Sequence, residues 1–160
     1  MINARVLTHL EAQTNSPVTT PQRTATAWIG RDVMLGGELT QLTRDAGPGS
    51  SFGQFHPATA HWRIGADDVG AFALHASPAV DARAEAGRLT IVTQAGDSTF
   101  RIAAPGMLPD AITLNRWTLP HLTVTIDTDA ADFALLPGPT YIDVVYRAAT
   151  RFDLRVTHHP

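Results

Sequence analysis

The sequence predicts an all-β fold, an antiparallel β-sandwich or barrel-like domain, with an N-terminal extension that contains a short helix. The first observation is alternation of apolar and polar residues in three segments, residues 122–127, 142–147 and 151–156. Period-two alternation indicates strands with one buried face. The second observation is rhythm, because roughly nine to eleven short segments of strand type are separated by turn residues about every eight to twelve positions, as is typical of sandwiches and barrels.

The composition fits one globular domain that is held without disulfides. The chain has 160 residues, 44% of them hydrophobic, and it contains no cysteine. A packed core or an assembly must therefore stabilise the fold. The formal net charge of −3 argues against a protein whose main task is to grip nucleic acid, and no apolar stretch approaches the ~20 residues of a membrane-spanning helix. We expect neither a membrane nor sequence-specific nucleic acid among the partners.

The chain is expected to divide into an N-terminal helix, linker and irregular extension, residues 1–53, and a β-sandwich core, residues 54–160, which together fold as one unit. Residues 1–14 place apolar side chains at helical spacing, which predicts a short helix. A helix of this length needs a surface to pack on, and this surface is either its own domain or a neighbouring subunit. Residues 15–23 contain two prolines and no periodicity, as is typical of a linker.

The rest of the extension mixes strand and loop signals. Residues 24–29 are rich in threonine and apolar residues, which predicts a strand. Residues 33–43 are expected to be broken at Gly36-Gly37. Residues 38–43 do not alternate cleanly, so a bulged strand and a single helical turn fit equally well there. Residues 45–53 combine glycine, proline and serine and are expected to form a loop.

Further strands are expected in the core. Residues 58–64 alternate weakly and place Ala60, Trp62 and Ile64 on one face, which indicates a half-buried strand. The proline- and glycine-rich residues 104–110 are expected to cross between strands. The other expected strands cover residues 71–76, residues 80–84, which also fit a helical turn, and residues 111–117.

Two hairpins are predicted from short interruptions between alternating segments. Residues 89–93 and 99–103 flank the triplet Ala95-Gly96-Asp97, which is a good turn signal. Between Tyr146 and Phe152 the chain has a connection whose length also suits a hairpin. A lone hairpin is only marginally stable in water, so these strands need a second layer from elsewhere in the chain.

The seven histidines do not form a metal-binding pattern. His56 and His61 are five positions apart, whereas metal-binding pairs are separated by two positions on a strand or by three or four on a helix. His158 and His159 lie in a polar tail and His121 is isolated, so solvated or hydrogen-bonded structural roles are expected. The sequence assigns no catalytic, cofactor-binding or metal-binding residue, and no cofactor is expected.

Three carboxylates, Asp127, Asp129 and Asp132, lie within one short segment. The calcium loop of EF-hands requires glycine at its sixth position and glutamate at its twelfth. Counted from Asp127, these positions hold Asp132 and Gly138, so the motif fails. We expect instead a turn in which aspartate side chains cap backbone N–H groups.

Two alternative functions depend on single features. A serine hydrolase would use Ser51, because residues 49–53 match the pattern Gly-x-Ser-x-Gly. The strand and helix that flank this motif in hydrolases are missing, which favours a loop. A carbohydrate-binding sandwich, lectin-like or receptor-binding, would place the three aspartates around a sugar or a calcium ion and would use tryptophans that stack on sugars. Core packing is the default for a tryptophan on a strand. The tryptophans are Trp28, Trp62 and Trp117.

The C-terminal segment carries a resemblance to a known class of proteins. Gly138, Tyr141 and Asp143 lie in residues 132–156, where a crossing is followed by a strand, a short turn and a last strand. In this order the segment resembles the small β-sandwich modules of bacteriophage tail and baseplate proteins. The resemblance implies a structural, non-enzymatic virion component, assembled in the bacterial cytoplasm, whose partners are copies of itself and other virion proteins. Such contacts would use edge-strand pairing and docking of the N-terminal arm in a symmetric assembly.

Overall fold

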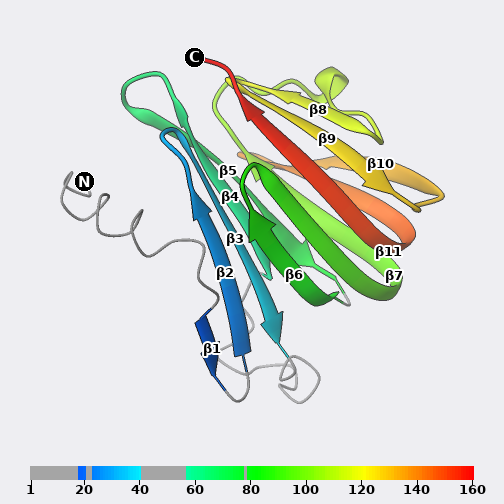
Figure 1. Ribbon diagram of the computed structural model, residues 1–160. Coiled ribbons are helices and arrows are strands. Elements are labelled where there is room, and N and C mark those ends of the chain that lie inside the picture. Colours follow the sequence, from blue (N-terminus) through cyan, green and yellow to red (C-terminus); the bar gives the residue numbers. More distant parts are fainter. Residues whose placement is uncertain (1–17, 21–22, 41–56, 78) are drawn as a thin grey trace.

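The computed structural model describes residues 18–20, 23–40, 57–77 and 79–160, and these are almost entirely β-strands (Figure 1). The predicted helix at residues 1–14 and the predicted loop at residues 45–53 lie outside the described residues. Every strand pair is antiparallel, so the predicted all-β, antiparallel class is confirmed. The strands are β1 (Val18–Thr20), β2 (Arg23–Ile29), β3 (Val33–Thr40), β4 (Ala58–Ile64), β5 (Asp68–Ala76), β6 (Ala79–Glu85), β7 (Arg88–Ala103), β8 (Arg116–Leu119), β9 (Leu122–Thr128), β10 (Asp132–Pro137) and β11 (Ile142–His158).

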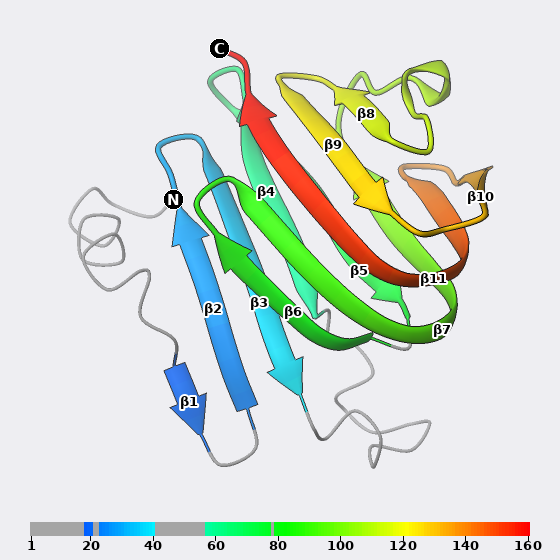
Figure 2. The same ribbon diagram turned by 45° about the vertical axis from the view of Figure 1, so that its right-hand side comes forward.

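The strands form two facing layers that share β7 and β11 (Figures 1 and 2). The larger layer runs from β1 through β5 to one half of β7, one half of β11 and β10. The smaller layer contains β6, the other halves of β7 and β11, then β9 and β8. β5 pairs with residues 99–103 of β7, whereas β6 pairs with residues 88–93. Each shared strand therefore passes from one layer into the other.

The two predicted hairpins, around Gly96 and between Tyr146 and Phe152, are wrong. β7 and β11 are continuous strands that curve together (Figure 2). Gly96 pairs with Ala149, and the register between the strands shifts on both sides of Ala149. Ala148 has a φ of 55°, which is uncommon for a residue with a Cβ. The interruptions of the alternating pattern are therefore a bulged bend at the corner of the sandwich, because bulges curve strands.

The predicted irregular extension over residues 1–53 is corrected in its described part. β1 lies within the predicted linker, residues 15–23, and pairs with β2. The strand predicted at residues 24–29 is present as β2. β2 pairs with β3, and β3 pairs with β4. Because β3 continues through Gly36 and Gly37, the described part of the extension is an integral part of the larger layer.

The predicted strand at residues 111–117 is also corrected. A 3-10 helix occupies Pro109–Ala111, and the N–H of Thr113 donates to the carbonyl of Arg116 at 2.8 Å, which closes a turn. β8 begins at Arg116, the last residue of this turn, so most of the predicted strand is a chain reversal. No helix in the described part of the chain is long and apolar enough to span a membrane.

The alternating patterns predicted the buried faces correctly. The side chains of Leu122, Val124 and Ile126 in β9 are buried. The side chains of Ala60 and Trp62 in β4 are buried as well. Residues 80–84, for which a helical turn was also open, belong to β6. Periodicity was therefore informative wherever a strand stays in one layer.

An aromatic cluster joins the two layers at the centre of the core. The ring centroid of Phe100 lies 5.3 Å from that of Trp117, 5.2 Å from Phe152 and 5.9 Å from Tyr146. The indole N–H of Trp117 donates to the hydroxyl of Tyr146 at 3.1 Å, and this hydroxyl donates to the carbonyl of Leu114 at 2.8 Å. Since Trp117 and Phe152 belong to the smaller layer, the cluster ties that layer to Phe100 and Tyr146 of the larger one.

The layers also meet where β6 passes over β3 (Figure 2). A Cβ at Gly37 would lie 2.7 Å from the carbonyl oxygen of Ala82 and 2.8 Å from the nitrogen of Ala84. Only glycine allows two backbones to approach this closely. The N–H of Ala84 then donates to the hydroxyl of Thr26 in β2 at 2.8 Å, so the layers are hydrogen-bonded at this edge.

Candidate functional site

Two hollows on the described surface differ in chemistry. The first, here named the apolar groove, has a volume of about 560 Å³ and lies between the loop after β7 and the turn between β10 and β11. Its lining is dominated by proline and other apolar residues, including Val69, Pro105, Met107, Pro109 and Pro137. Such a surface offers shape and apolar area but few hydrogen-bonding groups, which suits a protein partner better than a polar metabolite.

Exposed apolar side chains gather at the apolar groove. Val69 lines it and is 60% exposed, and Leu108, between two lining residues, is 65% exposed. Leu136 is 57% exposed and directly precedes the lining residue Pro137. The other large hydrophobic side chains that are exposed in the described residues are Met34 and Val92. Three of these five exposed side chains therefore lie in or beside the apolar groove.

A charged and aromatic cluster adjoins the apolar groove through Tyr141, which lines it. Arg101 of β7 and Asp143 of β11 are paired across the strands, and the guanidinium donates to both carboxylate oxygens at 2.8 and 2.9 Å. The Arg101 guanidinium also lies 3.9 Å from the ring centroid of Tyr141. A Cβ at Gly138 would clash with this ring, so glycine leaves room for the tyrosine. Gly138, Tyr141 and Asp143, the residues of the sequence resemblance, thus meet in one cluster.

In the part of the chain that the structure describes, β10 has one open sheet edge, and its end at Pro137 lines the apolar groove. Among the described residues, β10 pairs with β11 alone. Phe133 of β10 stacks on Tyr146, with ring centroids 6.1 Å apart, so one face of the strand is anchored in the core. Its other edge presents backbone groups that a further strand can use for pairing.

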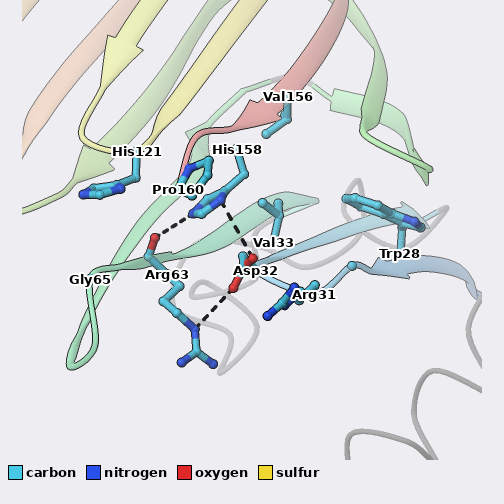
Figure 3. Close-up of a pocket in the computed structure, with 11 residues that line it drawn as sticks. Trp28, Arg31, Asp32, Val33, Arg63, Gly65, His121, Val156, His158 and Pro160 are labelled. Carbon is cyan, nitrogen blue, oxygen red and sulfur yellow. Dashed lines mark hydrogen bonds and ion pairs between the residues drawn. The ribbon is translucent and has the colours of Figure 1, made fainter.

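The second hollow, here named the polar groove, has a volume of about 590 Å³ (Figure 3). It is built where the β2–β3 turn, the end of β4 and the end of β11 meet. The turn is closed by a hydrogen bond from the N–H of Gly30 to the carbonyl of Val33 at 2.8 Å, which presents Arg31 and Asp32 at its tip. The N–H of Arg63 donates to the backbone carbonyl of Asp32 at 2.9 Å, and this bond fixes the turn against β4.

Charged and aromatic side chains meet in the polar groove. A carboxylate oxygen of Asp32 lies 3.5 Å from Nε of Arg63, and the other lies 4.0 Å from Nδ1 of His158. Nε2 of His158 donates to the backbone carbonyl of Arg63 at 2.9 Å. In Figure 3, Trp28 and His121 lie at opposite ends of the groove, with Asp32 and His158 between them.

The tryptophans and histidines considered in the sequence analysis lie in different environments. Trp62 and Trp117 are fully buried core residues, whereas Trp28 is half-buried and lines the polar groove. His158 was expected to be solvated, but it is half-buried in that groove, and Nδ1 of the exposed His121 donates to the carbonyl of His159 at 3.0 Å. Ser51 and His56 lie outside the described residues.

The three aspartates make hydrogen bonds and ion pairs within the chain. The carboxylate of Asp129 accepts from the backbone N–H groups of Thr150 and Arg151 at 2.8 and 3.2 Å, and it is hydrogen-bonded to the Thr150 hydroxyl. Asp127 lies 3.2 Å from Nη1 of Arg151, and Asp132 is paired with an arginine of β11. Asp129 therefore caps backbone N–H groups, as expected of an aspartate here, but these groups belong to the bend of β11 and not to its own turn. Within the described ranges, no group of three or more histidine, aspartate or glutamate side chains could hold a metal ion.

A family model described as "Domain of unknown function (DUF8770)" matches residues 7–133. The chain belongs to the DUF8770 family. No curated protein and no solved structure matches it. The matched range ends within β10, so the DUF8770 match does not include β11, although β11 contributes to both layers of this fold.

The pH dependence of stability is expected to reveal the role of Asp129. Hydrogen bonds from the hydroxyl and backbone N–H of Thr150 lower the pKa of Asp129 to about 2. Its contribution is therefore complete above the ordinary carboxyl pKa of ~4 and is lost as the pH falls from about 4 to about 2. Asp129→Asn is expected to reduce the change in the free energy of unfolding between pH 4 and pH 2. The reduction should be at most about 1 kcal/mol, because the group is exposed. Thermal unfolding at pH 2 to 7 checks this.

Asp110→Asn, at another exposed carboxylate, is the control for the Asp129 experiment. It is expected to leave the low-pH slope of the wild type unchanged. If Asp129→Asn and Asp110→Asn gave the same curve, the capping interaction would not contribute to stability.

Proposed function

We propose that this domain is a structural component of a tailed bacteriophage virion or a related particle, which works through contacts with copies of itself and with other virion proteins. The observation that carries the proposal is the apolar groove beside the open edge of β10. Exposed apolar patches of this kind mark interaction sites, and an open strand edge allows sheet-to-sheet pairing. The residues that resemble phage tail and baseplate modules, Gly138, Tyr141 and Asp143, form or support the same surface.

The proposed first partner is a second copy of the chain that docks on the apolar groove and β10. Two copies of an edge strand can pair around a two-fold axis, and a head-to-tail contact can close into a ring. In both cases Leu136, which is 57% exposed on β10, would become buried. A charge at this position would then oppose association without entering the core of the subunit.

Leu136→Asp is expected to convert an oligomer of the 160-residue chain into a monomer. Multi-angle light scattering and sedimentation over a concentration series measure the mass, and electron microscopy shows whether a closed ring is formed. The unfolding temperature of Leu136→Asp should stay near that of the wild type, because the side chain is exposed.

Val92→Asp is the matched control, since Val92 is 51% exposed on β7, outside the apolar groove. It is expected to keep the wild-type mass. A wild-type chain that is monomeric at every concentration, or a Leu136→Asp variant with the wild-type mass, would contradict self-association through this face.

A further inference from the structure

The polar groove has the three kinds of groups that recognise a sugar. The indole of Trp28 provides an apolar plane, and it lies so close to Gly30 that a Cβ there would be 2.8 Å from the ring. The carboxylate of Asp32 provides hydrogen-bond acceptors, and the guanidinium groups of Arg31 and Arg63 provide donors. Sugars combine an apolar face with a ring of hydroxyl groups, so they need this combination of an aromatic plane and converging polar groups.

The carboxylate of Asp32 retains capacity for a ligand. Its contacts with basic side chains are 3.5 Å to Arg63 and 4.0 Å to His158, longer than the 2.7–2.9 Å usual for a charge-assisted hydrogen bond. A carboxylate can accept about four hydrogen bonds. The position of Asp32 is nevertheless fixed, because the backbone of its turn is hydrogen-bonded to β4. The groove therefore holds a positioned acceptor that can bind hydroxyl groups.

The charge of the groove favours an acidic ligand. Of its two guanidinium groups, that of Arg63 is paired with Asp32 at 3.5 Å, and that of Arg31 lines the groove beside them. Arg31 is exposed, and within the described residues it makes no hydrogen bond or ion pair. A guanidinium without such a partner, at the tip of a fixed turn, suits bidentate hydrogen bonding to a carboxylate.

We propose that the polar groove binds an acidic oligosaccharide, a chain of sugar units that carry carboxylates. Trp28 stacks on the apolar face of one unit, Asp32 accepts from its hydroxyl groups, and Arg31 pairs with the carboxylate. The volume of about 590 Å³ and the separation of Trp28 from His121 along the groove (Figure 3) favour several linked units over a single sugar. This site is separate from the apolar groove, so its test is independent of the proposed assembly.

Calorimetric titration of the 160-residue chain with tetragalacturonate, and in parallel with the neutral tetramer maltotetraose, tests the proposal. Tetragalacturonate is expected to bind, and maltotetraose to bind roughly tenfold or more weakly, because a charge-assisted hydrogen bond is lost. Arg31→Ala is expected to weaken tetragalacturonate binding by a similar factor and to leave maltotetraose unaffected. Arg116→Ala, at an exposed arginine of β8 outside the groove, should behave as the wild type.

A second measurement places the ligand. In a ¹H–¹⁵N spectrum the indole signal of Trp28 is expected to shift on addition of tetragalacturonate, whereas that of the buried Trp117, which donates to Tyr146 in the core, stays in place. Equal affinity for the acidic and neutral tetramers would overturn the acidic class of ligand. The absence of binding by both tetramers, or binding that leaves the Trp28 signal and the Arg31→Ala affinity unchanged, would overturn the site itself.

Discussion

Replacement of Phe100 by alanine is expected to lower the free energy of unfolding by about 3–5 kcal/mol, the usual cost of removing a buried phenylalanine ring. Phe100 is completely buried and contacts aromatic rings of both layers. Its removal leaves a cavity at the place where Trp117 and Phe152 meet the larger layer. These neighbours are themselves fixed by strands and hydrogen bonds, so they cannot collapse fully into the space.

Chemical denaturation, followed by circular dichroism and by tryptophan fluorescence, measures this loss. Val92→Ala in the same strand is the control, because Val92 is 51% exposed, and its effect should stay below about 1 kcal/mol. A loss below ~1 kcal/mol for Phe100→Ala would show that the aromatic cluster does not hold the layers together.

Gly37→Ala is expected to destabilise the fold by about 1–3 kcal/mol, as is typical of forcing an extra methyl group into a packed site. The added Cβ would lie 2.7 Å from the carbonyl oxygen of Ala82 and 2.8 Å from the nitrogen of Ala84. Both atoms belong to the backbone of β6, so they cannot rotate away. β6 must move, and the hydrogen bond from Ala84 to Thr26 is lengthened or lost.

Gly36→Ala is a stringent control for this effect. A Cβ at Gly36 would meet the hydroxyl of Thr59 at 3.0 Å, and a threonine side chain can adopt another rotamer. Its cost, measured by the same denaturation experiment, is expected to be clearly smaller than that of Gly37→Ala. If the two costs were equal, the close approach of β6 would not be the cause. Hydrogen exchange at the Ala84 amide should increase in Gly37→Ala alone.

The fold class and the buried faces could be predicted because they depend on local patterns. Leu122, Val124 and Ile126 alternate with polar residues, and their burial needs no knowledge of the partner strand. The bends at Gly96 and Ala149 could not be predicted in this way. An interruption such as Ala95-Gly96-Asp97 suits a hairpin and a bulge equally well, and the choice is made by a strand that is distant in sequence.

The candidate sites were only partly visible in the sequence. Gly138, Tyr141 and Asp143 were singled out because they lie close together in the chain, but Arg101, which holds two of them, lies on another strand. The polar groove could not be predicted, because Asp32, Arg63 and His158 come together only through the topology of the sheet. The one available signal was an Arg-Asp pair directly after a glycine that ends a strand.

The passage of β7 and β11 through both layers also has a consequence for how the chain folds. The pairing of Leu89 with Leu154 joins residues far apart in sequence, so neither layer is complete until the C-terminal strand has been synthesised. Folds with many such distant pairings have a high contact order and fold in milliseconds to seconds. During synthesis on the ribosome, β7 and β9 would lack their partner strand until β11 has emerged. The two layers would then form in one cooperative step.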